Sequence, residues 1–306
     1  MQIDKRNGHC LYNDVEHVYW KEGTDEKYIS VTTLIGKFEA EFDADFWSKY
    51  KALERILGKE KFKLEKDKLL KIHKFDMDVL KLYDISEDEF LTVQESILQE
   101  WKEANAESCE RGSKIHAQLE AYSKGGKFKE KIVPKLNRDF DDFKCYVNPD
   151  KNELLKSIDR GILPEYLVYR ESDDGILKVA GQIDLLIKDG NDIYIVDYKT
   201  NKEIKMKSGF DTALKRNAMM KYPLNNLMDC NYIHYTLQLS TYAWILQKIN
   251  PEYNIKGLIL VHYDHSGNVT TYQLDYLKSD VERMLAYYKT IRKKEISEEL
   301  RKKIEF

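Results

Sequence analysis

The sequence has no long apolar run. None of its apolar stretches approaches the roughly 18 residues that a membrane-spanning helix needs. The first residues, Met1 to Arg6, form no apolar signal region. These absences argue against an integral membrane protein and a secreted one, and they predict a cytoplasmic location.

Cysteine is scarce, and its positions are scattered. The chain has 4 cysteines, and these are Cys10, Cys109, Cys145 and Cys230. No Cys-x-x-Cys motif and no Cys/His pairing appears, which argues against a zinc ribbon and against a disulfide scaffold. We therefore expect reduced thiols in a cytosolic compartment.

An excess of charge of one sign is also missing. Charged residues make up 34% of the chain, but the formal net charge is only -3. Bulk electrostatics therefore does not indicate a polyanionic partner, and any nucleic-acid surface must be a local basic patch. At 306 residues the chain can form one large domain or two moderate ones, each with a core of its own.

Two short apolar runs, Gly181–Ile187 and Ile193–Thr200, flank a Gly190–Asn191 pair. This pattern is typical of a β-hairpin with a two-residue turn. The turn would place Asp184 directly opposite Asp197, and strand alternation would place Lys199 on the same face.

Two acids facing each other across a β-ladder repel each other, and burying them without partners costs still more. A divalent cation bound between Asp184 and Asp197 would remove this conflict, with Lys199 beside it as a general base or water-positioning amine. The alternative is an exposed sheet face with scattered charges.

The remaining pattern predicts an α/β chain with a helical N-terminal part. Helices are expected over residues 44–56, 86–106, 108–123, 140–146, 235–249 and 279–294. Strands are expected over residues 17–20, 28–35, 163–169, 176–187, 193–200, 255–263 and 269–276. Residues 201–231 are polar, basic and without a predicted element.

Four further residues have functional and structural interpretations. Glu165 is either a third carboxylate of the metal site or an exposed charge. His116 shares a helical face with Glu120, and such a histidine is more often a core or surface residue than a ligand. Gln238 and Tyr242 are spaced to share a helix face, which by itself predicts only a helix packed on a sheet.

The order of five short motifs adds information that none of them carries alone. The motifs are Gly112-x-x-x-His116, Pro164-Glu165, Gly181-x-Ile183-Asp184, Val196-Asp197-Tyr198-Lys199-Thr200 and Gln238-x-x-x-Tyr242. This order resembles the RecB-like branch of the PD-(D/E)xK nuclease superfamily, and most of all its stand-alone phage and mitochondrial genome-maintenance exonucleases. The resemblance covers residues 112–246 and departs from the pattern at Ile183, where proline is common.

The resemblance implies a restriction-endonuclease-like core, with a mixed central sheet flanked by helices. It implies an N-terminal elaboration over residues 1–110 and a nuclease core over residues 111–306, packed as one compact unit. The related CRISPR-adaptation nucleases carry clustered cysteines near the C-terminus. Because the last cysteine here is Cys230, no iron–sulfur cluster is expected.

The resemblance also assigns roles to residues. It implies that His116, Asp184, Asp197 and the backbone carbonyl of Tyr198 bind the metal. Lys199 would orient and deprotonate the attacking water, and Glu165 would support the site or a second ion. Gln238 and Tyr242 would contact DNA or brace the site. Carboxylate ligands select a hard cation, Mg²⁺ or Mn²⁺.

The predicted function is a metal-dependent DNA exonuclease of replication, repair or recombination, of phage type. The alternatives are a structure-specific endonuclease on the same core and a non-catalytic nucleic-acid-binding module. The basic segment Lys202–Lys221 leaves the active-site strand and is predicted to clamp DNA through Lys205, Lys207, Lys215 and Arg216. The other candidate patches are residues 59–74, which also fit a solvated helix face, and residues 124–135.

Overall fold

The computed structural model describes residues 5–72, 74–124, 143–147, 152–211 and 216–304. The chain forms two compact units. The larger unit comprises Met1–Glu39, Ser113–Lys207 and Met219–Phe306, and the smaller unit comprises Ala40–Gly112 and Ser208–Ala218. The predicted division between residues 110 and 111 stays a prediction.

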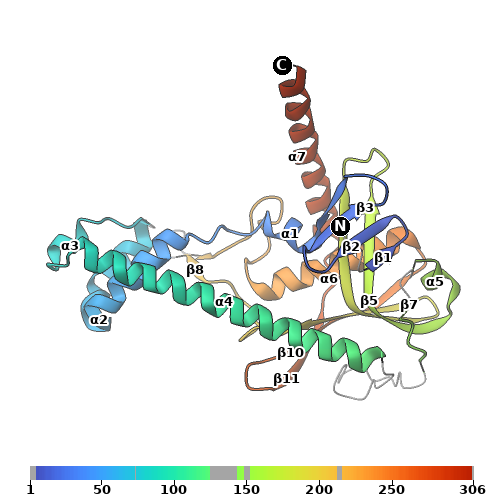
Figure 1. The fold of residues 1–306 in the computed structure, drawn as a ribbon, viewed down its shortest axis with the longest axis horizontal. Helices are drawn as coiled ribbons and strands as arrows, with labels where there is room; N and C mark the ends of the chain where they lie inside the picture. Colours follow the sequence, from blue (N-terminus) through green and yellow to red (C-terminus); the bar gives the residue numbers. More distant parts are fainter. Residues whose placement is uncertain (1–4, 73, 125–142, 148–151, 212–215, 305–306) are drawn as a thin grey trace. The chain divides into compact units, whose positions relative to one another are not determined.

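The larger unit is built around one mixed sheet of nine strands (Figure 1). The strands are β1 Lys5–Asn7, β2 Cys10–Asn13, β3 Val18–Lys21, β4 Lys27–Ser30, β5 Arg160–Glu171, β6 Lys178–Asp189, β7 Asp192–Lys199, β10 Asn254–Tyr263 and β11 Val269–Leu274. Their order is β1-β2-β3-β4-β6-β7-β10-β11, and β5 also pairs with β6. The β4–β6 and β7–β10 pairs are parallel and the others antiparallel.

The β6–β7 hairpin has the predicted register. Asp189 pairs with Asp192 across the turn, and Leu185 pairs with Val196. Gly190 has a φ of 60°, a left-handed conformation that glycine adopts at little cost and that two-residue hairpin turns require. The turn chemistry and the alternating apolar residues therefore determine this register together.

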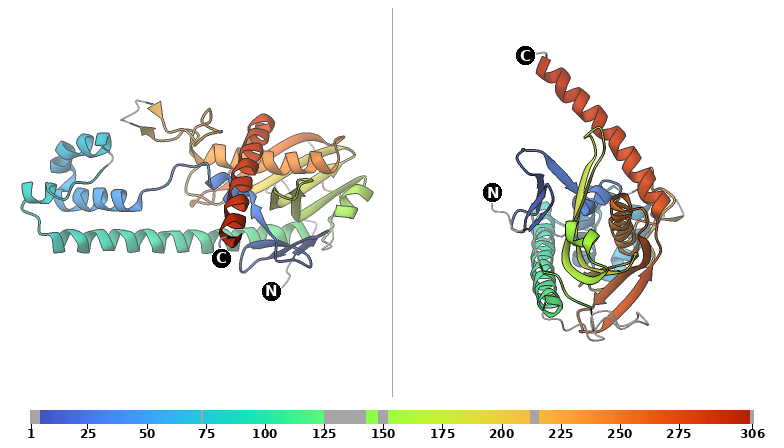
Figure 2. Two further views of the ribbon diagram at one scale, coloured as in Figure 1. Left: turned by 90° about the horizontal axis from the view of Figure 1, so that it is seen from above. Right: turned by 90° about the vertical axis from the view of Figure 1, so that its right-hand side faces the viewer.

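Helices cover both faces of the sheet (Figure 2). On one face, α6 (Asn231–Ile249), α1 (Val31–Gly36) and α7 (Lys278–Ile304) bury Leu237, Val31 and Met284 in a core with the sheet. On the other face, the last turns of α4 (Glu87–Lys124) pack Leu119 against Leu185, Val196 and Val261. This arrangement confirms the predicted α/β class with a mixed sheet flanked by helices.

Two predicted boundaries were wrong at the N-terminal side. Residues 31–35 form helix α1 rather than the end of a strand, because the Ser30 side chain accepts a hydrogen bond from the Thr33 amide at 3.0 Å and caps the helix. The two helices expected over residues 86–123 are the single helix α4. The short Ala106–Ser108 link between them contains no glycine or proline that would stop a helix.

The prediction of a helix over residues 140–146 was also wrong for the residues that the structure describes. Cys145 forms an isolated parallel bridge with Ile162, and the Tyr146 amide donates to the Ile162 carbonyl at 2.8 Å. Residues 140–142 lie outside the described residues. Edge pairing with β5 therefore overrides the local helical pattern.

The C-terminal helix α7 continues to Ile304, beyond the predicted end at residue 294. The added turns are rich in Glu, Lys, Arg and Leu, all good helix formers. Among the described residues, the structure also contains six short elements that the sequence did not predict. They are β1, β2, α3 Val79–Leu82, α5 Asn152–Ser157, β8 Phe210–Asp211 and β9 Arg216–Asn217. Among the described residues, no helix has the combined length and apolarity that crossing a bilayer requires.

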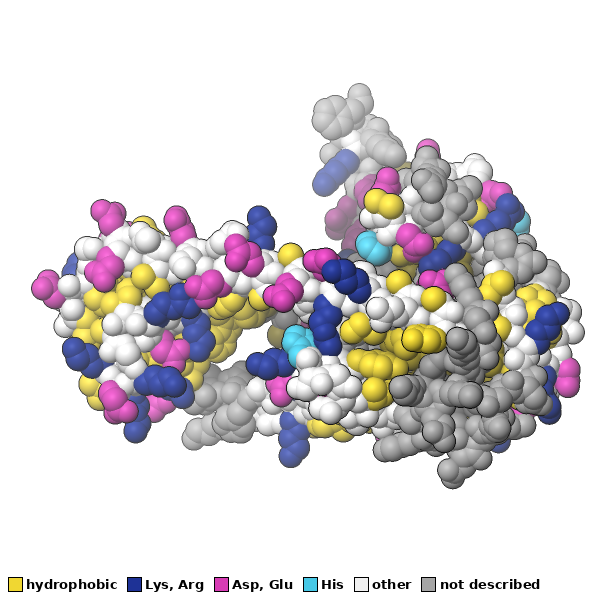
Figure 3. All heavy atoms as spheres, turned by 60° about the horizontal axis from the view of Figure 1, so that its bottom comes forward, with side chains coloured by type: hydrophobic (Ala, Val, Ile, Leu, Met, Phe, Trp, Pro, Cys, Tyr) yellow, Lys and Arg dark blue, Asp and Glu magenta, His cyan; other side chains and the backbone are white. Residues whose placement is uncertain are grey.

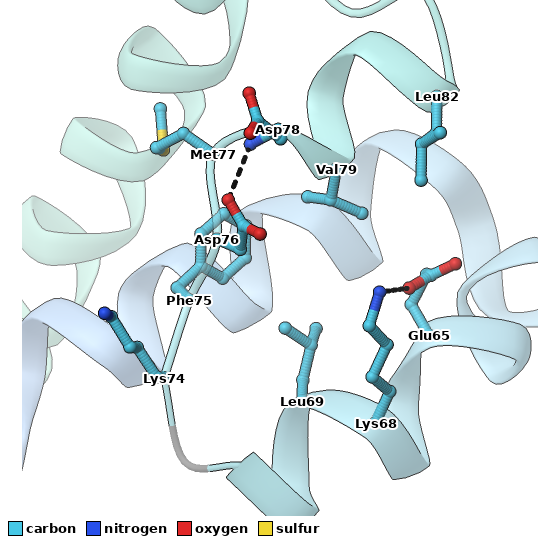
Figure 4. A pocket seen from close by; sticks show the side chains of 10 residues that line it. All are labelled: Glu65, Lys68, Leu69, Lys74, Phe75, Asp76, Met77, Asp78, Val79 and Leu82. Atoms are coloured by element: carbon cyan, nitrogen blue, oxygen red, sulfur yellow. Dashed lines mark hydrogen bonds and ion pairs between the residues drawn. The ribbon is translucent and has the colours of Figure 1, made fainter.

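The smaller unit has a core of its own. Helix α2 (Ala44–Ile72) turns at Gly58, where φ is 72°, and its two halves pack Tyr50 and Phe62 together with Phe90 of α4. A cavity of about 420 Å³ opens beside α3, and its lining mixes apolar and charged side chains (Figure 4). Its ion pair, Lys68 with Glu65 at 4.0 Å, joins residues one turn apart on α2.

One contact between the sheet and α6 can be tested by mutation. A Cβ atom at Gly181 would collide with Cε1 of the buried Tyr242 ring, so Gly181→Ala forces an overpacked contact. We expect a loss of about 1–3 kcal/mol in the free energy of unfolding, measured by urea denaturation. The matched control is Gly36→Ala, where a Cβ atom would meet no atom of the described residues within 4 Å. Equal unfolding midpoints for the two variants would contradict the close packing.

Candidate functional site

Three acidic residues lie side by side on three neighbouring strands. In the β5–β6 ladder Pro164 pairs with Leu185 and Tyr166 with Ile183, so Glu165 faces Asp184. One step beyond the last β6–β7 pair, the same hairpin register brings Asp184 opposite Asp197. The side chains of Glu165, Asp184 and Asp197 are 12%, 11% and 3% exposed. The site is therefore a nearly buried row of carboxylates.

Each of these carboxylates has a basic partner. Lys5 Nζ lies 2.8 Å from Glu165 Oε2, and His116 Nδ1 lies 3.5 Å from Asp184 Oδ2. Lys199 Nζ lies 2.6 Å from Asp197 Oδ2. Because buried charges are tolerated only when they are paired, these cations make the burial of the row possible.

The central acid, Asp184, is held in its charged form. Burial alone would raise the pKa of Asp184, but His116, Lys199 and the Tyr198 amide together keep it below its usual range. The Tyr198 amide donates to Asp184 Oδ2 at 2.7 Å. The backbone of β7 thus fixes the orientation of the acid on β6.

The pKa of Asp197 is shifted in the opposite direction from that of Asp184. Burial, with the repulsion from Asp184, raises the pKa of Asp197 to about 6 against the attraction of Lys199. Its buried Oδ2 atom is paired with the Lys199 ammonium at 2.6 Å, and among the described residues it has no other hydrogen-bond partner. A carboxylate oxygen in this state is a suitable ligand for a cation.

The carboxylates around Lys199 favour its charged, ammonium form. Burial would lower the pKa of Lys199, but Asp197 and Asp184 hold it above its usual value. A role as general base near neutral pH would need the opposite shift. As it stands, Lys199 is suited to donating a hydrogen bond to water or phosphate.

One face of α6 supports the site. Gln238 Nε2 donates to Asp197 Oδ1 at 3.1 Å and to the Tyr242 hydroxyl at 3.0 Å. The side chains of Gln238 and Tyr242 are both buried. Of the two roles that the resemblance implied for this pair, this burial favours bracing the site over contacting DNA.

Tyr235 is a third contributor from α6 that sequence reasoning missed. Its ring centroid lies 4.8 Å from Lys199 Nζ, and its hydroxyl donates to Asn201 Oδ1 at 2.7 Å. Tyr235 precedes Gln238 by three positions, so the helical spacing that linked Gln238 and Tyr242 could have found it. The contact places an aromatic ring beside the Lys199 ammonium.

Glu165 has an unusual backbone for a strand residue, with a φ of 52°. Non-glycine residues in this region are uncommon, and such strain concentrates at functional sites. Burial and the repulsion from Asp184 raise the pKa of Glu165 to about 7, against the attraction of Lys5. No motif indicated Lys5, because it lies 160 positions away in the sequence.

The predicted DNA-clamp residues are exposed where they are described. Lys205 and Lys207 lie in the larger unit and Arg216 in the smaller unit, and all three are exposed. Lys215 lies outside the described residues, as does most of the 124–135 patch. Lys205 Nζ lies 3.5 Å from Glu203 Oε1, and its backbone amide donates to Asn231 Oδ1 at the start of α6.

The donor set suits a hard divalent cation, because it consists of carboxylate oxygens and one imidazole. Within the part of the chain that the structure describes, no three or more His, Cys, Asp or Glu side chains are already gathered to hold a metal ion. In this structure the site is held by ion pairs, in which Lys199 lies against Asp197 and His116 lies against Asp184. Asp197 Oδ2 becomes available to a metal ion once the Lys199 ammonium, which lies 2.6 Å away, moves off it.

Comparison with known proteins agrees with this geometry. The sequence model of the PD-(D/E)XK nuclease superfamily matches residues 89–305, which is more than half of the chain. The chain therefore belongs to the PD-(D/E)XK nuclease superfamily, as the motif order predicted. No curated protein matches the sequence.

The solved structures include a match titled "Crystal structure of SSO0001", at 20% identity and a TM-score of 0.27. The match covers 42% of this chain and 49% of that one. The present chain thus matches about half the length of that relative.

The His116–Asp184 pair gives a testable titration. Burial would lower the pKa of His116, but the Asp184 carboxylate raises it to about 9. In protein freed of metal with EDTA, NMR should therefore show a His116 ring that is still protonated near pH 7.5. The ion pair makes its full contribution to the free energy of unfolding below pH 6.5, the ordinary pKa of histidine. This contribution is lost as the pH rises through about 9, where His116 loses its proton.

Asp184→Asn should return the His116 titration towards its ordinary range, because the neutral amide no longer attracts the imidazolium. A His116 ring that titrates at the same pH in the parent and in Asp184→Asn would contradict the pairing.

Proposed function

We propose that this protein is a divalent-metal-dependent exonuclease that hydrolyses DNA in replication, repair or recombination, of phage type. The observation that carries the proposal is the row of Glu165, Asp184 and Asp197 on adjacent strands, with Lys199 two residues beyond Asp197. Membership of the PD-(D/E)XK nuclease superfamily supports nuclease chemistry at this row. The motif order supports the exonuclease type.

Asp184 and Asp197 would hold the ion, with His116 and the backbone carbonyl of Tyr198 as further ligands. A bound Mg²⁺ or Mn²⁺ supplies an activated water and neutralises charge on the scissile phosphate. To act as a ligand, His116 must first lose its proton, so metal affinity should rise with pH. Lys199 must also move away from Asp197 Oδ2, which it contacts at 2.6 Å.

Once separated from Asp197, the Lys199 ammonium would donate to the attacking water or to a phosphate oxygen. The Tyr235 ring at 4.8 Å limits where the lysine can go. Gln238 keeps Asp197 in place through its 3.1 Å hydrogen bond. These supports hold the reacting groups in position, which is a large part of what an active site contributes to rate.

The acids provide the first test of this function. Asp184→Asn and Asp197→Asn should each abolish Mg²⁺-dependent cleavage, since each removes a charge that binds the ion. Cleavage is measured on end-labelled linear single- and double-stranded DNA beside covalently closed circles. The matched control is Asp192→Asn, at the far end of β7, which should cleave at the parental rate.

The substrate panel decides the type of nuclease. An exonuclease degrades the linear molecules and leaves the closed circles intact, whereas cleaved circles would identify an endonuclease. Full activity in folded Asp184→Asn or Asp197→Asn would remove the acid row from the mechanism. A parent protein that binds DNA but cleaves none of the substrates would indicate a binding module.

We also propose that the segment Lys202–Lys221 clamps the DNA strand. Basic and acidic side chains are intermingled on the face drawn in Figure 3, so affinity must come from local lysines. The segment follows the strand that carries Asp197 and Lys199, and its Lys205 is tied to the first turn of α6 by the Asn231 side chain. This link between Lys205 and the helix that carries Gln238 supports a DNA contact at Lys205.

Replacing Lys205, Lys207, Lys215 and Arg216 together by Gln should weaken DNA binding and flatten its salt dependence. Each lost phosphate contact reduces the slope of log K against log salt by about 0.7 for single strands and about 0.9 for duplex DNA. The control removes the same charge from α7, at Lys293, Lys294, Arg301 and Lys302. If the clamp variant keeps the parental slope, the DNA contact lies in another basic patch, and residues 59–74 are the first candidate.

A further inference from the structure

Lys5 occupies a cradle of oxygen atoms at one end of the acid row. Its Nζ lies 2.8 Å from Glu165 Oε2, 3.1 Å from Gln182 Oε1 and 3.3 Å from Asp14 Oδ1. A lysine ammonium has three hydrogens to donate, and here each hydrogen has an acceptor. The contacts come from β1, β5, β6 and the turn after β2, so the fold gathers this cradle from distant parts of the sequence.

The cradle adjoins the proposed metal site. Glu165 faces Asp184 across the β5–β6 ladder, and neighbouring strands are about 4.8 Å apart. A divalent ion bound at Glu165 would therefore lie next to an ion bound by Asp184 and Asp197. Two ions about 3.5–4 Å apart form the two-metal arrangement used by many phosphodiesterases.

The charge and geometry of the cradle suit an ammonium. Three oxygens at 2.8–3.3 Å are at hydrogen-bonding distance from nitrogen, whereas Mg²⁺ ligands lie at about 2.1 Å in an octahedron. Lys5 is 23% exposed and Glu165 is 12% exposed, so the pair is well shielded from water. Removing only one partner of such a shielded ion pair is destabilising, because it leaves the other charge without a counter-ion.

We propose that Lys5 is a built-in counter-ion that takes the place of a second divalent cation beside Glu165, so that this active site binds a single metal ion. The inference rests on the proposed function, since it counts the ions of that site. The inference gives Glu165 a defined role. The Glu165 carboxylate holds Lys5, and the Lys5 ammonium neutralises the charge of Glu165 next to Asp184. Lys5 is thus a positioning residue for the acid row.

The experiment counts bound Mn²⁺ from the EPR signal of the free ion during titration of the folded protein. We expect one bound ion in the parent and one in Lys5→Arg, which keeps the charge. Lys5→Met keeps most of the side-chain stem but leaves the oxygen cradle without a cation, so a second, weaker Mn²⁺ should bind. The double variant Lys5→Met with Glu165→Gln removes both charges and should return to one ion.

The variant Glu165→Gln alone gives a reading that does not depend on how well Lys5→Met folds. One bound ion in both the parent and Glu165→Gln supports the inference. Two ions in the parent and one in Glu165→Gln would overturn it, as would a single ion in folded Lys5→Met.

Failure of the proposed function would be recognised separately. It would appear as no Mn²⁺ binding and no cleavage in the parent, whatever residue stands at position 5. Loss of the inference alone would leave metal-dependent cleavage and change only the number of ions.

Discussion

The larger unit must accommodate three carboxylates on adjacent strands, and their mutual repulsion influences much of the surrounding structure. Asp184 repels both Glu165 and Asp197 and raises the pKa of each, in addition to the effect of burial. Each acid is paired with one basic side chain, and each basic side chain comes from a different element. Lys5 comes from β1, His116 from α4 and Lys199 from β7. Unfolding would release these charges to water, so the site and the stability of the sheet are linked.

Helix α6 is the rigid support that this arrangement requires. Successive turns of one face contact Lys199, Asp197 and Gly181 through Tyr235, Gln238 and Tyr242. The absence of a side chain at Gly181 lets the Tyr242 ring approach the strand that carries Asp184. Packing and chemistry therefore share the same residues, so a change that loosens α6 should also misplace the reacting groups. This is the expected design when reacting groups are held by rigid elements.

Sequence patterns predicted the hairpin well and the connections poorly. The β6–β7 register followed from local turn chemistry at Gly190 and from alternation, both of which act over a few residues. Local propensity failed at Cys145, where an edge pairing with Ile162 replaced a predicted helix. It also failed at residues 31–35, where the cap at Ser30 began a helix inside a β-like run. In each case a specific hydrogen bond overcame a weak intrinsic preference.

By itself, the sequence determined the superfamily, the mixed α/β fold and the opposition of Asp184 and Asp197. These depend on short-range spacing and on motif order, which a single chain displays directly. Only the tertiary structure decided that Lys5 meets Glu165, that Tyr235 contacts Lys199, and that Gln238 and Tyr242 are buried. It also decided that the pKa of Lys199 is raised rather than lowered. The physical reason is that burial and charge pairing depend on distances between residues far apart in the chain, which no local pattern encodes.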